Sequence, residues 1–164
     1  MDAFCLSYIK DRAPILCGRV LDVGSYNENG EVRSVIPVDV GIDMRAGPGV
    51  DLVCLAEDLL DHFEPESFDS ITCLNTMEHV EHWREALKAI WECLKPGGVL
   101  VFGVPNLSKG AHGYPQDYWR WADPDLEYIF GVKPMVNGKL QILTTRKMAP
   151  LPDLSVIHPL RVSG

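Results

Sequence analysis

The sequence lacks an excess of positive charge. Its 15 lysines and arginines stand against 23 aspartates and glutamates, so the formal net charge is -8. A general DNA- or RNA-binding protein needs a basic stripe to neutralise phosphates, and this composition argues against one. The charge suits a cationic or neutral small ligand at least as well. We therefore expect a small-molecule partner and no bulk nucleic acid.

Long apolar runs are also missing. No stretch is long enough to span a membrane, and the N-terminus carries acidic Asp2 where a secretory signal would be basic. We expect a cytoplasmic protein without a membrane span, and the sequence leaves a homodimer open. The five cysteines are scattered and form no Cys-x-x-Cys pair, which argues against a disulfide framework or a zinc knuckle.

Glycine is scarce where a dinucleotide-binding loop would need it. In VLDVGSYNENG, residues 20–30, an apolar run ends at Asp22, and the only glycines are Gly24 and Gly30. A pyrophosphate is held by several backbone N–H groups at a helix N-terminus, which is why dinucleotide loops carry three glycines. The stretch is therefore a degraded dinucleotide loop, an ordinary turn, or a loop for a ligand that needs fewer glycines.

The apolar runs predict an α/β fold with a parallel sheet in a single domain. They are continuous rather than alternating, as in strands that are covered on both faces. Between the last two runs, apolar residues recur at helical spacing from Val80 to Leu94, and Pro96 with the glycines after it ends that helix. We predict a short helix over residues 3–12 and strands over residues 19–24, 38–43, 50–56, 68–75 and 98–105.

The later part of the chain is less regular. A helix is predicted with Asp123 at its N-cap, Pro124 at its first helical position and Gly131 after its end. Residues 137–147 predict a strand after a turn. We assign residues 1–150 to one domain and residues 151–164 to a C-terminal tail or arm.

Ligands of open parallel sheets bind at the carboxyl ends of the strands. The first predicted strand ends at Asp22 and Gly24, and the second ends at Asp43, about twenty residues later, the usual distance to an acid that grips a ribose diol. The plain alternative is that Asp43 only ends a strand. S-adenosylmethionine has a ribose and an adenine but no phosphate, so one glycine with Asp22 behind it suffices for that ligand.

Four segments widen the pattern: VLDVGS, VGIDM, FDSITCLNTMEHVEHW and LKPGGVLVFGVP occur in this order. Together they resemble the class I S-adenosylmethionine-dependent methyltransferases, in particular the small type 11 methyltransferase domains, over about residues 19–131. The resemblance implies a Rossmann-like, mostly parallel sheet with helices on both faces and one antiparallel strand near the end. The segment after Gly24 is short, so we expect a shortened first helix, together with a reduced C-terminal part.

The resemblance also implies where the cofactor binds. The first motif would line its methionine part, Asp43 would bind the ribose, and Met44 would lie against adenine. Many members of the family have an acid where Leu55 stands here, so the adenine contact falls to Glu57 or Asp58, or is lost. The predicted cofactor-binding residues are Asp22, Gly24, Ser25, Asp43, Met44, Ala56, Glu57, Asn75 and Thr76.

Histidines near the start of the long predicted helix are candidates for chemistry. His79 and His82 are three residues apart and share a helix face. A metal site would need further ligands, for which His112 and Asp117 are the candidates, and we predict no metal. We name His79 and His112 as candidate catalytic residues, because histidine titrates near neutrality and acts as a general base. The alternative is a structural hydrogen bond at the start of the helix.

The segment HGYPQDYWRWADPDL, residues 112–126, follows the fifth predicted strand. Similar proteins associated with bacterial surface-glycan clusters carry such a segment, which implies a place on the acceptor side of the cofactor. We predict Tyr114, Asp117, Tyr118 and Arg120 as substrate-binding residues, with Arg120 facing an acid group. The alternative is that the aromatic residues pack and seal the pocket.

These patterns predict an enzyme that moves a methyl group from S-adenosylmethionine to an oxygen or nitrogen atom of a small-molecule or sugar (glycan) acceptor. Holding the donor and the acceptor in line supplies much of the rate, so a dedicated base is not required. One alternative is a catalytically silent cofactor-binding or scaffold subunit, which the missing acid at Leu55 favours. Another, less favoured, is an NAD-dependent oxidoreductase, which the missing glycines oppose.

Overall fold

A single sheet forms the centre of the molecule. The computed structural model describes residues 3–28, 30–112 and 115–162, and within them the large sheet has seven strands in the order β3-β2-β1-β4-β5-β8-β7. Strands β1 to β5 run parallel, whereas β8 is antiparallel to β5, and β7 is antiparallel to β8. Their bounds are Val20–Val23 (β1), Val40–Asp43 (β2), Leu52–Val53 (β3), Phe68–Leu74 (β4), Leu94–Pro105 (β5), Met135–Asn137 (β7) and Leu140–Arg146 (β8).

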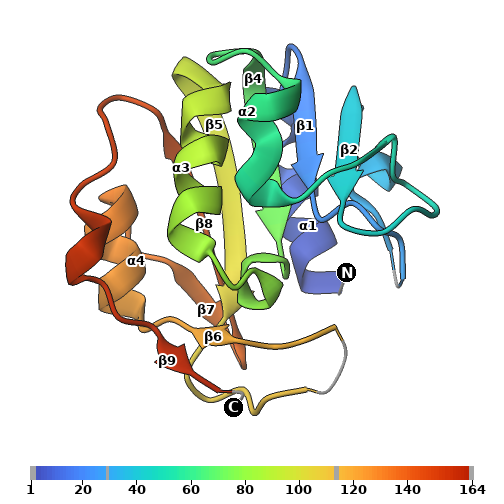
Figure 1. Cartoon of the computed structure of the whole chain (residues 1–164). Helices are drawn as coiled ribbons and strands as arrows, with labels where there is room; N and C mark the ends of the chain where they lie inside the picture. The colour runs from blue at the N-terminus through green and yellow to red at the C-terminus, as the bar shows by residue number, and fades with distance from the viewer. Residues whose placement is uncertain (1–2, 29, 113–114, 163–164) are drawn as a thin grey trace.

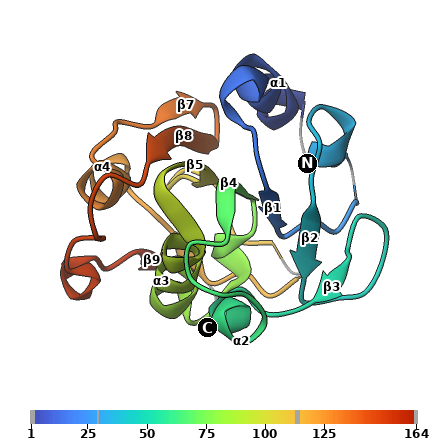
Figure 2. The same cartoon turned by 90° about the horizontal axis from the view of Figure 1, so that it is seen from above.

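Helices cover both faces of this sheet, as predicted. Figure 2 shows α1 on one face and α2 and α3 on the other, and α4 packs beside α3 (Figure 1). The α-helices are α1 (Ala3–Arg12), α2 (Leu59–His62), α3 (Trp83–Cys93) and α4 (Asp123–Phe130). The shorter 3-10 turns are η1 (Ala13–Ile15), η2 (Val32–Ser34), η3 (Ala56–Asp58), η4 (Met77–His79) and η5 (Leu154–Val156).

Two apolar clusters hold the layers together, one on each face of the sheet. Cys5, Tyr8 and Ile9 of α1 are buried in one cluster with Val20 and Ile142 of the sheet. The larger cluster joins the other face to the apolar stripe of α3, whose buried residues include Trp83, Leu87, Ile90 and Trp91. The predicted period of apolar residues is confirmed within α3, because those positions point at the sheet. Val80 and Leu94, the ends of the predicted stripe, lie outside the helix, after η4 and at the start of β5.

The connection between β1 and β2 contains one 3-10 turn, η2, and no α-helix among its described residues. This confirms the expected shortening of the first helix. Residues 26–28 pass along the edge of the cavity described below instead of entering a helix. The predicted strand over 50–56 is wrong in length, because the pairing of β3 ends when the Cys54 N–H donates to the Asp43 carbonyl and the chain turns into η3.

Two further predictions need correction. The fifth strand starts at Leu94 rather than at residue 98, because Leu94 pairs with Phe68 across an irregularity in the register. The N-cap of α4 is Ala122, not Asp123: Ala122 is extended, and the Asp125 carboxylate accepts its N–H at 3.1 Å. Gly131 closes the helix with φ +67°, as predicted.

The C-terminal segment crosses back over the structure. Strand β9 (Leu160–Arg161) pairs with β6 (Trp119–Arg120), and Leu154 and Ile157 are buried in the larger core cluster. The Arg84 side chain of α3 donates to the Leu154 carbonyl at 3.0 Å. The division of the chain at residue 150 stays a prediction. None of the described helices has the length and apolar composition needed to cross a bilayer.

Candidate functional site

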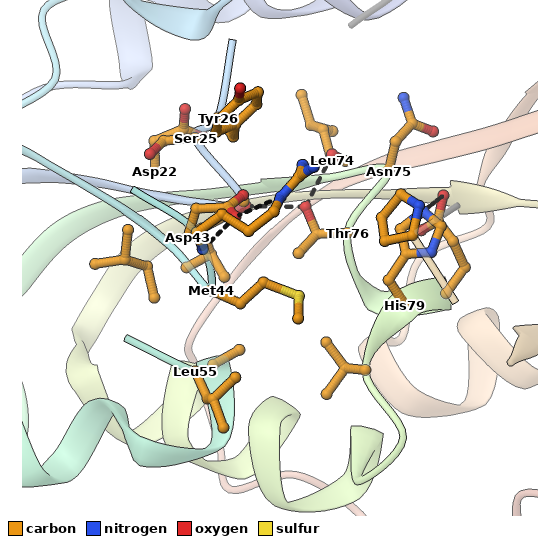
Figure 3. Close-up of a pocket in the computed structure, with 18 of the residues that line it drawn as sticks. Asp22, Ser25, Tyr26, Asp43, Met44, Leu55, Leu74, Asn75, Thr76 and His79 are labelled. Atoms are coloured by element: carbon orange, nitrogen blue, oxygen red, sulfur yellow. Dashed lines mark hydrogen bonds and ion pairs between the residues drawn. The ribbon is translucent and has the colours of Figure 1, made fainter. Parts of the chain in front are cut away.

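A cavity of about 620 Å³ opens at the carboxyl ends of β1, β2 and β4. This is where an open parallel sheet binds ligands, because the ends of neighbouring parallel strands meet at one edge. Figure 3 shows Asp22, Asp43 and Leu55 toward one end of the cavity and Asn75 and His79 toward the other. The lining includes all the predicted cofactor-binding residues, namely Asp22, Gly24, Ser25, Asp43, Met44, Ala56, Glu57, Asn75 and Thr76.

Gly24 is required where β1 turns into the cavity. Its φ is +81°, and a Cβ there would lie 1.8 Å from Oγ1 of Thr76. The Thr76 hydroxyl in turn donates to the Val23 carbonyl at 3.1 Å, so the ends of β1 and β4 are held against each other. The Gly24 and Ser25 N–H groups both donate to the Ile42 carbonyl at 2.9 Å. These two amides are therefore already used inside the protein, unlike the amides of a pyrophosphate-binding loop.

Asp22 is a buried acid beneath the cavity. It is 3% exposed, and the Thr72 hydroxyl donates to its Oδ1 at 2.6 Å. Burial raises the pKa of Asp22 to about 6, and the Thr72 hydrogen bond opposes that rise. A cation bound in the cavity would stabilise the ionised form of this carboxyl.

The loop after Gly24 forms one wall of the cavity. Tyr26 and Glu28 line it, and the Arg45 guanidinium lies 4.3 Å from the Tyr26 ring centroid and 3.3 Å from a Glu28 oxygen. The backbone N–H of Arg45 also donates to Asp43 Oδ1 at 3.0 Å. The sequence left open whether Tyr26 and Glu28 touch a ligand, and it did not predict Arg45 in the site. The contacts of these residues join two loops about twenty residues apart and follow no periodic pattern.

The opposite wall is apolar and exposed. Met44 is 54% exposed and Leu55 is 43% exposed, and both line the cavity with Ala56. Large apolar side chains on the rim of a cavity are typical of ligand-binding sites. Glu57 lines the cavity and Asp58 is not among its lining residues.

The far end of the cavity holds the predicted catalytic histidines. His79 and His112 both line it, and their rings lie 4.9 Å apart between centroids. Burial lowers the pKa of His79, and the carbonyl of Gln116 lies 2.9 Å from its Nδ1. Glu78 also lines the cavity and is 1% exposed, and burial raises its pKa to about 7. Sequence reasoning did not include Glu78 among the site residues, although the adjacent His79 marked the position.

Asp117 and Arg120 do not face this cavity, which corrects their prediction as substrate-binding residues. Arg120 is fully buried and forms a bidentate ion pair with Asp117. Its remaining donors go to the carbonyls of Lys109, Gly110 and Trp119, so all five guanidinium N–H groups are used. Arg120 therefore has no donor for an acid group of an acceptor, and the pair fixes the loop instead.

The other members of this segment differ in their roles. Tyr118 lines the cavity, and its role in substrate binding stays a prediction. Tyr114 lies outside the described residues. Trp121 is 1% exposed and packs edge-on against Trp83, and the Trp119 Nε1–H donates to the Val80 carbonyl at 3.0 Å, so these two rings serve packing.

Comparison with known proteins agrees with this geometry. Residues 3–133 match a family model described as a methyltransferase domain. The ubiquinone biosynthesis O-methyltransferase of Idiomarina loihiensis is 38% identical over 122 residues, which are 74% of this chain and 47% of that protein. The protein of the same name from Pseudomonas syringae pv. tomato is 31% identical over 147 residues, which are 79% of this chain and 59% of that protein. The chain thus spans about half the length of these curated relatives.

Solved structures share the fold. Burkholderia thailandensis 1,6-didemethyltoxoflavin-N1-methyltransferase, solved with 1,6-didemethyltoxoflavin and S-adenosylhomocysteine bound, superposes with a TM-score of 0.62 at 16% identity, over 90% of this chain and 80% of that chain. The YcgJ protein of Bacillus subtilis superposes with a TM-score of 0.52 at 20% identity, over 64% of this chain and 52% of that chain. At these identities the likeness concerns the fold.

Proposed function

Since the chain belongs to the methyltransferase domain family, we propose that it transfers a methyl group from S-adenosylmethionine to an oxygen or nitrogen atom of a small-molecule or sugar acceptor. One observation carries this proposal: the residues expected to bind the cofactor, which come from four separate strand ends, line one cavity. Its volume of about 620 Å³ is of the size that small-molecule and cofactor sites have.

Each part of the cofactor has a matching wall in this proposal. The Asp43 carboxylate accepts from the ribose hydroxyls, and the apolar rim of Met44 and Leu55 covers the adenine. Gly24 lets the methionine part approach the end of β1, with the buried Asp22 carboxyl behind it. A sulfonium and an ammonium group near Asp22 favour its ionised form, because opposite charges stabilise each other strongly where water is excluded.

The acceptor then approaches from the end of the cavity that holds His79, His112 and Tyr118. A lone pair of its oxygen or nitrogen attacks the methyl carbon, the C–S bond breaks, and the electron pair stays on sulfur to give S-adenosylhomocysteine. Alignment of the two partners supplies much of the rate. His79 is the proposed proton acceptor, because burial keeps it neutral near pH 7.

The acceptor class rests on analogy with relatives. The curated relatives are named as O-methyltransferases and the Burkholderia enzyme as an N1-methyltransferase, so both oxygen and nitrogen acceptors occur among similar proteins. An NAD-dependent oxidoreductase is disfavoured, because the Gly24 and Ser25 amides already donate to Ile42. A catalytically silent scaffold is the remaining alternative, and the experiment below distinguishes it from an active enzyme.

Calorimetry with S-adenosylmethionine and S-adenosylhomocysteine tests cofactor binding. We expect both to bind the wild-type chain, and we expect Asp43→Ala to weaken binding about 10- to 100-fold, because about 1.4–2.8 kcal/mol of charge-assisted hydrogen bonding is lost. Asp61→Ala is the matched control, since Asp61 is an exposed carboxylate of α2 outside the cavity lining.

The outcomes separate the alternatives. If neither cofactor bound at millimolar concentration, the proposal would be refuted. Cofactor binding without methylation of any member of a broad panel of hydroxyl and amine acceptors would support the scaffold. A fluorescence titration with NADH tests the oxidoreductase, which requires binding of that ligand in the same cavity.

A further inference from the structure

Three side chains with metal-ligating atoms converge at the acceptor end of the cavity. Glu78 and His79 come from η4, directly after β4, and His112 comes from the segment after β5. One carboxylate oxygen of Glu78 and one ring nitrogen of each histidine all lie within 4.8 Å of one another. Glu78 and His79 are neighbours in the chain, whereas His112 comes close to them only through the tertiary structure.

Glu78 is a buried acid with one unsatisfied oxygen. It is 1% exposed, and no described group donates a hydrogen bond to its Oε2. Its Oε1 lies 3.9 Å from His79 Nε2. A buried carboxylate is costly unless a hydrogen-bond donor or a cation lies beside it. A metal ion bound between Glu78 and the two rings would fill that role.

The ring of His79 is oriented to present a lone pair. Its Nδ1 lies 2.9 Å from the Gln116 carbonyl oxygen, which only accepts hydrogen bonds, so Nδ1 carries the proton. Nε2, the nitrogen nearer to Glu78, then has the free lone pair. Histidines that bind metals are held in the same way, with the second nitrogen donating to a carbonyl or a carboxylate.

His112 is held by a rigid neighbour. Its backbone N–H donates to Asp117 Oδ2 at 3.0 Å, and its Nε2 lies 3.6 Å from the same oxygen. The bidentate pair with Arg120 fixes Asp117 in turn. A carboxylate thus lies beside the second imidazole as well, which is a common arrangement around metal-binding histidines.

From this convergence we infer that Glu78, His79 and His112 bind a divalent transition-metal ion of the Zn²⁺ type. Two imidazole nitrogens and one carboxylate oxygen suit Zn²⁺, Co²⁺ or Fe²⁺, whereas Mg²⁺ and Ca²⁺ prefer oxygen ligands. Three protein ligands leave a coordination position open toward the cavity, as in catalytic zinc sites. Ligand atoms of a tetrahedral ion lie about 3.4 Å apart, so the side chains must draw together by about 1 Å on binding.

The site gives the proposed methyl transfer a preferred acceptor, and this step rests on the proposed function. With a metal bound, His79 would be a ligand and would no longer accept the proton. An acceptor hydroxyl in the open position would instead lose its proton to solvent, because a bound divalent cation stabilises the oxyanion. That oxygen forms the new O–C bond as the C–S bond breaks and sulfur keeps the electron pair. The substrate class is therefore a hydroxyl-bearing molecule whose oxygen reaches the metal.

Lys109 is the competing cation. It lines the same cavity, and its charge lowers the pKa of Glu78 against the larger effect of burial. If its ammonium is the true partner of Glu78, added metal will not bind there. A Co²⁺ titration distinguishes a metal ion from the Lys109 ammonium as the partner of Glu78.

Cobalt absorption is the test, because the visible bands of Co²⁺ report its coordination. The chelator-treated chain of residues 1–164 is titrated with Co²⁺, and then Zn²⁺ or Mg²⁺ is added in excess. We expect one Co²⁺ per chain with the intense bands of a four- or five-coordinate nitrogen-oxygen site, displaced by Zn²⁺ and not by Mg²⁺. Glu78→Gln and His112→Gln should each weaken binding at least about 10-fold, since each removes one of three ligands.

His82→Gln is the matched control, because His82 lines the cavity outside the cluster. It should leave the Co²⁺ spectrum unchanged. Folding of every variant is checked by circular dichroism, and His112, at 35% side-chain exposure, is the substitution least coupled to the core. The metal site is refuted if Co²⁺ gives no such bands, or if His112→Gln binds Co²⁺ as tightly as His82→Gln does. Calorimetry with S-adenosylhomocysteine on metal-free protein reports the proposed function separately.

Discussion

Replacement of Asp22 by asparagine should make the stability of the protein less dependent on pH. Asp22 is buried, and its pKa is raised from 3.8 to about 6. An acid whose pKa is higher in the folded state takes up a proton on folding between those values. Folding is therefore penalised as the pH rises through that window, and the full penalty is present above about pH 6.

The size of the effect follows from the shift. The rise of the Asp22 pKa from 3.8 to about 6 corresponds to about 3 kcal/mol of unfolding free energy. Asparagine keeps an oxygen that can accept the Thr72 hydroxyl. Its amide needs a new acceptor, which costs about 1–3 kcal/mol at every pH if none is found. The difference in unfolding free energy between variant and wild type should still move by about 2–3 kcal/mol in favour of the variant from pH 4 to pH 8.

Urea denaturation of the cofactor-free chain at several pH values measures this difference. Asp61→Asn is the control, because that carboxylate is exposed and should show almost no change with pH. A constant difference between Asp22→Asn and wild type across the range would refute the argument. It would mean that Asp22 ionises in the folded protein as easily as in the unfolded chain.

Three further predictions concern other parts of the structure. Gly24→Ala should destabilise the fold by at least about 3 kcal/mol, because its Cβ would lie 1.8 Å from the Thr76 side chain. Gly138→Ala, with φ +58° and open space around the new Cβ, should cost only about 1 kcal/mol in the same urea assay. Equal losses for the two variants would contradict the argument. Arg120→Met should cost about 3–5 kcal/mol in thermal unfolding, because it leaves the buried Asp117 carboxylate uncompensated. Arg161→Met, which removes the exposed pair with Glu81, should cost under about 1 kcal/mol. Similar losses would show that burial of the pair does not matter. A thiol reagent should titrate one of the five cysteines of the native chain rapidly, since Cys17 alone is exposed, and fast reaction of a second would contradict the packing.

The sequence alone determined the sheet and the cofactor end of the site. Asp22, Gly24, Asp43 and Thr76 stand at or just after the ends of predicted strands, and neighbouring parallel strands end at the same edge. The strand-end rule thus predicted Asp22, Gly24 and Asp43 at this edge, and the resemblance to class I methyltransferases added Thr76. The sequence also predicted the apolar stripe of α3, because residues that repeat with the helical period lie on one face of a helix.

Only the tertiary structure decided the acceptor end. Helical spacing paired His79 with His82, yet Glu78 and His79 lie in the short turn η4. His112 follows β5 in the chain, and the fold places it beside them. Arg120 has the chemistry of an anion-binding residue, but the chain folds its own Asp117 and nearby carbonyls around it. Contacts between irregular loops are set by how the chain closes in space, and no spacing in the sequence records that.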